Sequence, residues 1–324
     1  MQAIQIQQTG GPEVMTVRDL PTPEPGPGEA LVRLEASGVN FIDVYLREGR
    51  YPAPLPYTLG QEGAGTIVAL GEKTSEGGLN VGDRVAWCSV PGTYAQMALA
   101  PVSRLIRVPE AMTSQQAAAA MLQGMTAHYL AHSCYAIQPG DEVLVHAGAG
   151  GVGLLLIQMA KSLGARVFTT VSNEEKAELA REAGADEVIL YTHEDFAAAI
   201  KRLASGPGLH AVYDSVGKTT FEKSLEVLRS RGMVVLYGGS SGAVPPFDLI
   251  RLSTMGSLYV TRPNLKDYTA TREELEARAG AVLSDVASGR LKLRIAHVYQ
   301  LADAESAHRD LEARRTTGKV LLIP

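Results

Sequence analysis

The chain has 324 residues and a mass of 34.4 kDa, more than one hydrophobic core usually serves, so we expect two domains or one unusually large domain. Its 45% of apolar and 20% of charged residues exclude a disordered chain, and no apolar stretch is long enough to cross a bilayer. The 30 basic and 35 acidic residues give a formal charge of −5, which does not favour a polyanionic partner such as nucleic acid.

The first third of the chain has the pattern of strands broken by turns. Apolar and polar residues alternate near the N-terminus, and a proline- and glycine-rich segment follows at 21–28. Five prolines from Tyr51 to Pro101 disfavour long helices there. From Ala117 the chain becomes rich in alanine and lacks proline, which predicts a helix and a change of domain.

The segment from 142 to 239 alternates short apolar strands with helix-length segments. This pattern predicts crossover units and a parallel sheet that is covered on both faces. Gly164, Gly184 and Gly232 each follow a predicted helix, where a glycine with left-handed backbone conformation is expected. The predicted strands are 142–147, 165–171, 186–191, 210–216 and 232–239, the predicted helices are 153–164, 173–184, 194–205 and 218–230, and further helices at 271–289 and 303–315 precede a last strand at 319–323.

A glycine-rich turn joins the first of these strands to its helix. Gly148, Gly150 and Gly153 have the G-x-G-x-x-G spacing of a dinucleotide-binding loop. Glycines let the backbone approach a pyrophosphate, and N–H groups at the helix N-terminus attract its negative charge. The same spacing also occurs in tight turns that bind nothing, but the strand before it and the helix after it favour a nucleotide. We predict that Gly150, Gly151, Val152 and Gly153 contact a dinucleotide.

The end of the second parallel strand decides between NAD and NADP. An acidic residue there would bind the adenosine ribose of NAD, but this strand ends in Ser172 and Asn173. Lys176 follows in the next helix, and Tyr191 ends the next strand. Because a lysine attracts a 2′-phosphate, we predict NADPH as the cofactor, bound by Ser172, Lys176 and Tyr191. The alternative is that Lys176 is a solvated surface lysine.

Two later strand ends are also candidates for the nucleotide site. In open parallel sheets, ligands bind beyond the carboxyl ends of the strands, where the strand order reverses. The fourth strand ends near Val216, and the fifth ends near Gly238, Gly239 and Ser240. We expect these four residues to contact the cofactor.

Five segments resemble one protein family. They are 10–14 (GGPEV), 38–52 (GVNFIDVYLREGRYP), 147–153 (AGAGGVG), 212–217 (VYDSVG) and 256–263 (GSLYVTRP). Together they resemble the medium-chain dehydrogenase/reductases, and within these the zeta-crystallin-like NADPH:quinone oxidoreductases. The resemblance implies an α/β fold with two domains. These are a GroES-like, mostly β catalytic domain of residues 1–122 and 264–324, and a doubly wound Rossmann domain of residues 123–263 that binds NADPH.

The resemblance also implies a set of site residues. Asn40 and Tyr45 are expected beside the nicotinamide, where an amide and a phenol donate hydrogen bonds to the acceptor oxygen. Tyr51 is expected to flank the substrate cleft, and Thr126 to reach the carboxamide. The alternative for the two tyrosines is packing in the core or at the rim. Further cofactor contacts are implied for Tyr129, Pro263, Leu265 and Arg314, with Arg315 as the alternative to Arg314.

Two further expectations follow from the resemblance. Gln123 stands where many relatives have lysine, which lowers the positive charge near the cleft. The strand at 256–260 is expected to pair with its counterpart in a second subunit, which gives a homodimer.

Three features of the sequence bear on metal binding. Zinc alcohol dehydrogenases of the same superfamily have a cysteine where this chain has Asn40, and a His-Glu pair where it has Gln61 and Glu62. His128 and His132 have the spacing of two ligands on one helix face, but no third ligand lies nearby in the sequence. We therefore predict no bound metal, and an acceptor that needs little activation, such as a quinone.

The cysteines and the N-terminus indicate a compartment. Cys88 and Cys134 are too few for a disulfide framework or a four-cysteine zinc site. The N-terminal residues lack the charged and apolar regions of a signal peptide. We therefore expect a cytoplasmic protein.

Three functions compete. The favoured one is zinc-independent hydride transfer from NADPH to a small quinone, with water or Tyr45 as the proton donor. The second is NADPH-dependent reduction of the double bond of an α,β-unsaturated carbonyl compound, an enal or enone, which needs an acid near the α-carbon, and the sequence offers no evident one. The third is a non-catalytic crystallin-like relative that binds NADPH or RNA, although the net negative charge argues against RNA.

Overall fold

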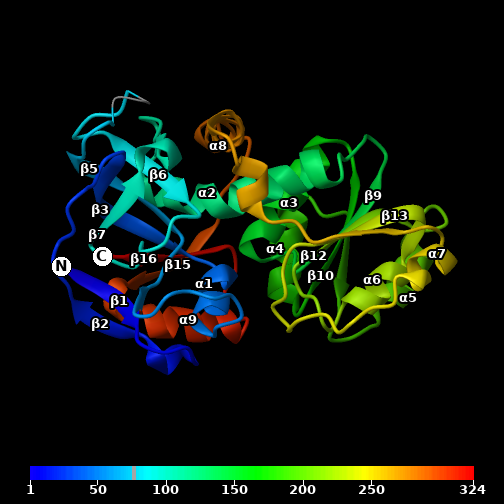
Figure 1. Ribbon diagram of the computed structural model, residues 1–324. Coiled ribbons are helices and arrows are strands. Elements are labelled where there is room, and N and C mark those ends of the chain that lie inside the picture. Colours follow the sequence, from blue (N-terminus) through cyan, green and yellow to red (C-terminus); the bar gives the residue numbers. More distant parts are fainter. Residues whose placement is uncertain (75–77) are drawn as a thin grey trace. The chain divides into compact units, whose positions relative to one another are not determined.

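The computed structural model describes residues 1–74 and 78–324 and divides the chain into two compact units (Figure 1). Unit 1 contains Met1–Met125 and Tyr268–Pro324, and unit 2 contains Thr126–Asp267. The boundaries expected from the sequence, after residues 122 and 263, each lie a few residues earlier. Unit 1 is mostly β and unit 2 alternates strands with helices, so the predicted α/β fold class is confirmed.

Unit 1 is built on two sheets. One has the strand order β2-β1-β4, and the other has the order β15-β16-β3-β5-β6-β8 with β7 paired to β3. Trp87 lies fully buried in the core of the larger sheet. The strands are β1 Gln2–Ile6, β2 Thr16–Asp19, β3 Glu29–Val39, β4 Tyr57–Thr58, β5 Glu62–Leu70, β6 Arg84–Cys88, β7 Met97–Pro101, β8 Ile106–Arg107, β15 Ile295–Gln300 and β16 Lys319–Ile323.

Two helices of unit 1, α1 and α8, begin at polar caps. At α8, Thr271 accepts a hydrogen bond from the Glu274 N–H and Glu274 accepts one from the Thr271 N–H, a reciprocal cap. At α1, the Asn40 N–H donates to Asp43 at 2.9 Å. The helices are α1 Phe41–Arg47, α2 Ser114–Tyr129, α8 Arg272–Ala287 and α9 Ala304–Glu312, with 3₁₀ turns at Pro12–Val14, Val102–Arg104, Leu265–Thr269 and Leu301–Asp303; α2 and the turn Leu265–Thr269 extend into unit 2.

Unit 2 has one sheet of six parallel strands in the order β11-β10-β9-β12-β13-β14, with helices on both faces (Figure 1). This is the doubly wound order, and it reverses between β9 and β12. The strands are β9 Glu142–His146, β10 Arg166–Val171, β11 Glu187–Leu190, β12 Leu209–Asp214, β13 Leu228–Leu236 and β14 Tyr259–Thr261. The helices are α3 Gly151–Ser162, α4 Glu174–Glu182, α5 Phe196–Leu203, α6 Phe221–Glu226 and α7 Ile250–Thr254, with a π-helical turn at Leu130–Cys134.

One expected boundary in unit 2 is wrong. Gly164 and Gly184 have φ angles of 84° and 105°, as predicted for residues that end helices. Gly232 instead lies inside β13, and the left-handed residue is Arg231, with φ 61°. Position 232 requires glycine for a different reason, because a Cβ there would lie 2.9 Å from the Arg229 carbonyl oxygen. The predicted helix 218–230 accordingly ends at Glu226.

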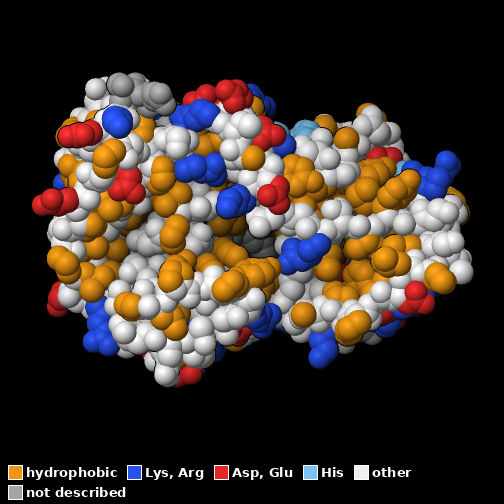
Figure 2. All heavy atoms as spheres, viewed as in Figure 1, with side chains coloured by type: hydrophobic (Ala, Val, Ile, Leu, Met, Phe, Trp, Pro, Cys, Tyr) orange, Lys and Arg blue, Asp and Glu red, His pale blue; other side chains and the backbone are white. Residues whose placement is uncertain are grey.

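The surface carries mixed charge. On the face drawn in Figure 2, basic and acidic side chains are interspersed with apolar ones and do not merge into one basic patch. Within the described ranges, 1–74 and 78–324, every helix is too short or too polar to serve as a membrane span.

Candidate functional site

In unit 2 the glycine-rich loop packs closely on its helix. Gly150 is the N-cap residue of α3, which begins at Gly151. A Cβ on Gly153 would lie 2.9 Å from the Cα of Gly148, and a Cβ on Gly148 would lie 3.0 Å from the Cβ of Thr169. Glycine is therefore required at both positions, as expected for a loop that holds a helix N-terminus against the first strand.

The N-terminus of α3 is suited to a phosphate group. The helix has 12 residues, and its first turn contains no acidic side chain. Gly150 and Gly151 have no side chains and are partly exposed, so a ligand can approach the first N–H groups of the helix. The left-handed residue of the loop is Ala147, with φ 56°, and it is exposed.

The turns after β12 and β13 are joined through their backbones. The Ser240 N–H donates to the Ser215 carbonyl at 3.1 Å, and the Ser241 N–H donates to the Val216 carbonyl at 2.9 Å. Gly238 approaches Ser215 so closely that a Cβ would lie 2.5 Å from its carbonyl oxygen. The structure thus brings Val216 together with the Gly238–Ser240 segment, which sequence reasoning assigned to the cofactor.

A buried carboxylate organises the turn after β12. Asp214 is 0% exposed and accepts hydrogen bonds from the N–H groups of Val216 and Gly217, at 2.8 and 3.0 Å. The Thr220 hydroxyl lies 2.7 Å from the second carboxylate oxygen. All of these partners lie within six residues of Asp214, so the turn depends on its own segment.

A buried histidine connects this carboxylate to the neighbouring strands. His146 ends β9, and its Nε2 lies 3.1 Å from the Ser224 hydroxyl, which in turn lies 3.4 Å from Asp214. Its Nδ1 lies 2.9 Å from the Thr170 hydroxyl at the end of β10. Burial lowers the pKa of His146, although the charge of Asp214 opposes this. The cluster therefore ties together the carboxyl ends of β9, β10 and β12.

The residues expected at the adenosine end follow neighbouring strands. Ser172 follows β10 and Tyr191 follows β11, and the Tyr191 N–H donates to the Val171 carbonyl at 3.2 Å. The Asn173 side chain accepts from the Lys176 N–H at 3.0 Å and so caps α4. Lys176 lies in the first turn of that helix and is partly exposed. The Asn173 oxygen is thus used within the protein, and a contact of Lys176 with a 2′-phosphate stays a prediction.

Four further predicted cofactor residues lie elsewhere in unit 2. Thr126 and Tyr129 lie in the last turns of α2 and are 7% and 2% exposed. Pro263 and Leu265 follow β14 and are buried. Their contact with a nucleotide stays a prediction.

In unit 1 the Asn40 amide is fully hydrogen-bonded inside the protein. Its Nδ2 donates to Glu62 at 2.9 Å and to the Gly38 carbonyl at 3.3 Å. Its Oδ1 accepts from Lys319 Nζ at 2.9 Å and from Gln123 Nε2 at 3.3 Å. An amide has only two N–H hydrogens, so Asn40 has none left for an acceptor oxygen. In this structure both hydrogens are used within the protein, and the expected role of Asn40 beside the nicotinamide stays a prediction.

Lys319 and Glu62 form a buried ion pair next to Asn40. The Lys319 ammonium donates to Glu62, and both side chains are at most 2% exposed. Glu62 also accepts the Leu122 N–H of α2 at 2.5 Å. A Cβ on Gly38 would lie 2.6 Å from Lys319 Nζ, so glycine leaves the space that the pair occupies.

The predicted tyrosines pack against each other. The rings of Tyr45 and Tyr51 are 5.8 Å apart at 83°, and Phe41 lies 6.1 Å from Tyr45. The Arg50 guanidinium lies 5.2 Å from the centre of the Tyr45 ring. Tyr45 is 8% exposed and Tyr51 is 40% exposed, so the pair runs from the core to the surface.

A buried network of polar side chains lies beneath α1. Arg47 Nη1 contacts His308 Nδ1 at 3.0 Å, His308 Nε2 contacts the Tyr94 hydroxyl at 3.1 Å, and that hydroxyl contacts Asp43 at 3.2 Å. Arginine only donates, so His308 carries its proton on Nε2 and the Tyr94 hydroxyl donates to Asp43. Arg47 also binds Glu312 through two hydrogen bonds, at 2.9 and 2.8 Å.

Burial shifts the pKa values of two side chains in this network. It raises the pKa of Asp43 to about 7, against the opposing effects of the Asn40 N–H, Lys319 and Tyr94. It lowers the pKa of His308 to about 3, and the adjacent Arg47 adds to the effect. Asp43 Oδ1 has no hydrogen-bond partner among the described residues, consistent with a carboxyl that favours its neutral form.

The C-terminal tail carries the predicted arginine. Arg314 is exposed and has a left-handed φ of 58°. Arg315, the alternative, forms an ion pair with Asp310 at 2.9 Å. The contact of Arg314 with the cofactor stays a prediction.

The potential metal ligands and thiols do not form a cluster. In the part of the chain that the structure describes, no group of three or more His, Cys, Asp or Glu residues has a metal-binding arrangement. The rings of His128 and His132 lie 4.4 Å apart. Cys88 is buried and Cys134 half-buried, both as thiols, and burial raises the pKa of Cys88 to about 12.

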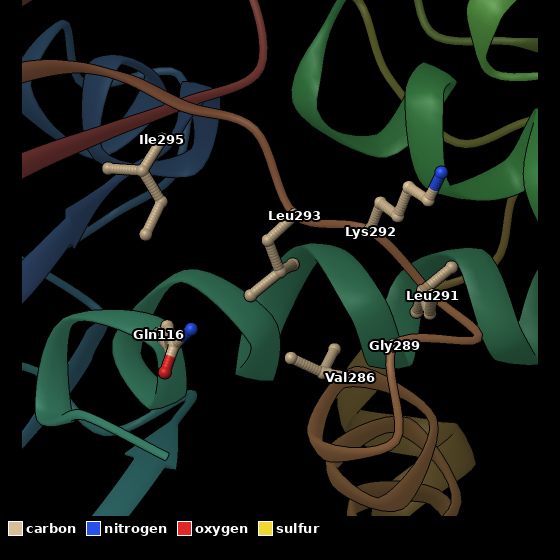
Figure 3. A pocket seen from close by; sticks show the side chains of 7 residues that line it. All are labelled: Gln116, Val286, Gly289, Leu291, Lys292, Leu293 and Ile295. Atoms are coloured by element: carbon tan, nitrogen blue, oxygen red, sulfur yellow. The ribbon is translucent and has the colours of Figure 1, made fainter.

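A pocket of about 440 Å³ lies in unit 1 apart from the predicted residues (Figure 3). Its lining comes from the start of α2, the end of α8 and the segment that leads to β15. Most of the lining side chains are apolar. They are Gln116, Val286, Gly289, Leu291, Lys292, Leu293 and Ile295. None of these carries a role in the chemistry expected from the sequence.

Sequence reasoning missed several residues of these networks. Lys319 and His308 come from segments that showed only a strand or a helix pattern. Arg47 and Asp214 lie in two of the segments that resemble the family, but neither residue was given a role. The available signal was a charged residue in an otherwise apolar strand, as with Lys319 at the start of β16 and Glu62 at the start of β5. Such residues require a buried partner.

Comparisons with known proteins cover the whole chain. The family model described as "Alcohol dehydrogenase GroES-like domain" matches residues 26–110, and the one described as "Zinc-binding dehydrogenase" matches 151–277. A quinone oxidoreductase of Pseudomonas aeruginosa is 46% identical over 323 residues, 99% of both chains. A 2-haloacrylate reductase of a Burkholderia species is 39% identical over 328 residues, 98% of both chains.

Solved structures resemble the chain equally well. A mycobacterial protein complexed with NADPH matches with a TM-score of 0.97 and 49% identity, and covers 100% of both chains. The quinone oxidoreductase of Escherichia coli complexed with NADPH matches with a TM-score of 0.97 and 42% identity, again over 100% of both chains.

Proposed function

The chain belongs to the quinone oxidoreductase family of the medium-chain dehydrogenase/reductase superfamily, and we propose that it transfers hydride from NADPH to small quinones. The observation that carries this proposal is the full-length similarity to quinone oxidoreductases. Two of the solved structures that resemble the chain are complexes with NADPH. The local geometry of each unit supports a distinct part of it.

The residues of unit 2 fit the dinucleotide. Gly148 and Gly153 have no room for side chains, and the N-terminus of α3 offers N–H groups to the pyrophosphate. Ser172, Lys176 and Tyr191 would bind the 2′-phosphate, while Val216 and Gly238–Ser240 would flank the nicotinamide side. When bound, NADPH supplies the hydride. Thr126, Tyr129, Pro263, Leu265 and Arg314 complete the proposed set of cofactor residues.

The residues of unit 1 fit a planar acceptor. Tyr45 and Tyr51 form an aromatic wall that is partly buried, and a quinone ring can stack on or against it. We propose that the Tyr45 hydroxyl binds the acceptor oxygen. The Asn40 amide supports the site through its neighbours instead of binding the acceptor itself, because its hydrogens are already used.

The chain's own residues also support a reaction without zinc. Asn40 and Glu62 stand at positions where zinc dehydrogenases of this superfamily have ligands, and the Lys319 ammonium binds both side chains. A fixed cation on these two residues occupies the donor atoms that a zinc ion would need. A quinone needs little activation, so hydride transfer can proceed without a Lewis acid.

Steady-state kinetics tests the proposal. The protein should oxidise NADPH in the presence of 1,4-benzoquinone or a naphthoquinone, and it should prefer NADPH to NADH. A preference of about tenfold or more for NADH would contradict the assignment of Lys176. NADPH binding without quinone-dependent oxidation would favour the non-catalytic, crystallin-like alternative.

The second candidate is reduction of an α,β-unsaturated carbonyl compound. The observation that favours it is the 39% identity with a 2-haloacrylate reductase over nearly the full length of both chains. The same assay with enals, enones and 2-haloacrylate, followed by product analysis, separates the two functions. A higher kcat/KM with one of these acceptors than with any quinone would make this the main activity.

We also propose a homodimer formed through unit 2. β14 is the edge strand of the six-stranded sheet, and its residues Tyr259 and Val260 are 56% and 37% exposed. An apolar edge strand readily pairs with a copy of itself, which would join two sheets into one. Val260→Lys should yield monomers in sedimentation experiments, and an unchanged dimer would overturn the proposal.

We place the protein in the cytoplasm. Both cysteines are thiols, which is the state that a reducing compartment maintains. Fractionation of cells that produce the protein tests this placement.

A further inference from the structure

The orientation of the Asn40 amide is determined by its neighbours. The Lys319 ammonium can only donate hydrogen bonds. The Asn40 atom that faces it at 2.9 Å must therefore be the oxygen, Oδ1. The nitrogen then faces Glu62 at 2.9 Å, as an acceptor requires. Lys319 and Glu62 together exclude the flipped amide, in which an N–H would point at an ammonium.

The orientation of the Asn40 amide also determines the orientation of the Gln123 amide. Asn40 Oδ1 can only accept, so the Gln123 atom that contacts it at 3.3 Å is the nitrogen, Nε2. One Nε2 hydrogen is used in this contact. The second hydrogen and Oε1 have no other partner among the residues that the structure describes, and the side chain is half-buried.

Gln123 therefore differs from Asn40 in what it can offer. Asn40 is 5% exposed, and both of its amide hydrogens are used. Gln123 is more accessible and still has one N–H group to donate. It also lies one residue after Leu122, whose N–H binds Glu62, so this part of α2 is fixed to the buried ion pair.

We propose that Gln123 donates a hydrogen bond to the oxygen of the quinone, and that Lys319 is the positioning residue that orients its amide through Asn40. This inference rests on the proposed function and adds a specificity-determining residue to it. The amide is neutral, so it suits an uncharged acceptor whose oxygen becomes negative only as the hydride arrives. A lysine at this position would instead favour acceptors that are already anionic.

The first experiment replaces Gln123 by alanine in the full-length protein. A hydrogen bond to a group that becomes charged is worth a factor of about ten to a hundred, so kcat with 1,4-benzoquinone should fall by about that factor. The Kd of NADPH, measured by calorimetry, should stay within twofold. Gln115→Ala is the matched control, because Gln115 is an exposed glutamine on the same helix with no partner in the contacts described. It should keep the wild-type kcat.

The second experiment tests the positioning role. Lys319→Met should lower kcat, and the double variant Lys319→Met/Gln123→Ala should be no slower than Gln123→Ala alone, because both changes remove the same interaction. A purely structural lysine would give multiplicative losses instead. Glu62→Gln/Lys319→Met removes both charges, so it keeps the core neutral if the single variant does not fold. It should show the same lack of additivity with Gln123→Ala.

The outcomes separate the inference from the function beneath it. Less than a twofold change in kcat for Gln123→Ala would overturn the role of Gln123, and multiplicative losses would overturn that of Lys319. In either case the wild-type protein would still be a quinone reductase. If the wild-type protein does not oxidise NADPH with any quinone, the proposed function fails, and the inference fails with it.

Discussion

Unit 1 and unit 2 both bury charged side chains beneath their candidate sites, but they satisfy them differently. In unit 2, Asp214 accepts hydrogen bonds from N–H groups two and three residues further along the chain. In unit 1, Arg47 binds Glu312, which lies 265 residues away, and Glu62 binds Lys319, which lies 257 residues away. The backbone hydrogen bonds of Asp214 are made within its own turn, whereas the ion pairs of unit 1 need both ends of the chain.

Because of this difference, the stability of unit 1 and ligand binding by unit 2 can be measured separately. In unit 1 the C-terminal tail supplies the partners of α1 and β5, so the residues proposed to bind the acceptor depend on long-range contacts. In unit 2 the residues proposed to bind the nucleotide lie in short turns. Trp87 is the single tryptophan and lies buried in unit 1, so its fluorescence reports the unfolding of that unit. NADPH binding reports unit 2.

The largest effect is expected from Arg47→Met. Arg47 is fully buried and joins α1 to α9 through Glu312 and His308, so its loss leaves buried partners unpaired. The free energy of unfolding seen by Trp87 should fall by about 3–5 kcal/mol. Arg166→Met is the control in unit 2, where Arg166 is 31% exposed and its ion pairs with Glu142 and Glu187 are worth about 1 kcal/mol, and it should leave the unfolding seen by Trp87 unchanged. Equal losses in chemical denaturation would remove the contrast between the units.

The next effect is expected from Asp214→Ala. The change removes the acceptor of two backbone N–H groups and of the Thr220 hydroxyl, so the turn that carries Val216 should loosen. The Kd of NADPH should rise by about tenfold or more, which corresponds to about 1.4 kcal/mol. The Trp87 transition should stay at the wild-type denaturant concentration. A shift of that transition with unchanged NADPH affinity would reverse the assignment of the two units.

The same contrast explains what could be predicted from the sequence. The glycine loop, the helix predicted from residue 271 and the last strand are encoded in contiguous residues, and the structure has them where local patterns placed them. The helix α1 was not predicted, because seven residues are too few for a recognisable periodicity. At Gly232 the pattern was misinterpreted, since close backbone packing and not a helix end requires glycine there.

The candidate site was predictable only in part for the same reason. Residues at strand ends of unit 2 follow from the alternation of strands and helices. The partners of Asn40 do not, because nothing in the pattern around Lys319 indicates that it meets residues near position 40. The role expected for Asn40 came from the family resemblance, and the contacts that use both of its amide hydrogens were not part of that expectation.

The third prediction concerns pH and distinguishes two groups of unit 1. Native His308 has a pKa of about 3 against 6.5, so between these values only the unfolded chain gains a proton, and stability falls as pH decreases. Native Asp43 has a pKa of about 7 against 3.8, so the native state holds the extra proton, and stability falls as pH increases. Each slope is at most about 1.4 kcal/mol per pH unit, and in the wild type the two oppose each other.

Two variants separate these slopes. His308→Gln leaves only Asp43, so the stability of unit 1 should decrease as pH rises from about 4 to about 7. Asp43→Asn leaves only His308, so stability should decrease as pH falls from about 6.5. Urea titrations followed by Trp87 fluorescence give both slopes. If stability changed with pH in the same way in both variants, the buried network of polar side chains would not control the pH dependence of stability.

The smallest effect is expected from Lys176→Met, which tests whether unit 2 can change its ligand without changing stability. Lys176 is partly exposed in the first turn of α4, so an ion pair with a 2′-phosphate should be worth about 1 kcal/mol. The ratio of the Kd values for NADH and NADPH should therefore fall by about fivefold. Lys201→Met is the control, because Lys201 is an exposed lysine of α5 that pairs with Glu226. An unchanged ratio in Lys176→Met would assign the choice of NADPH to Ser172 and Tyr191 instead.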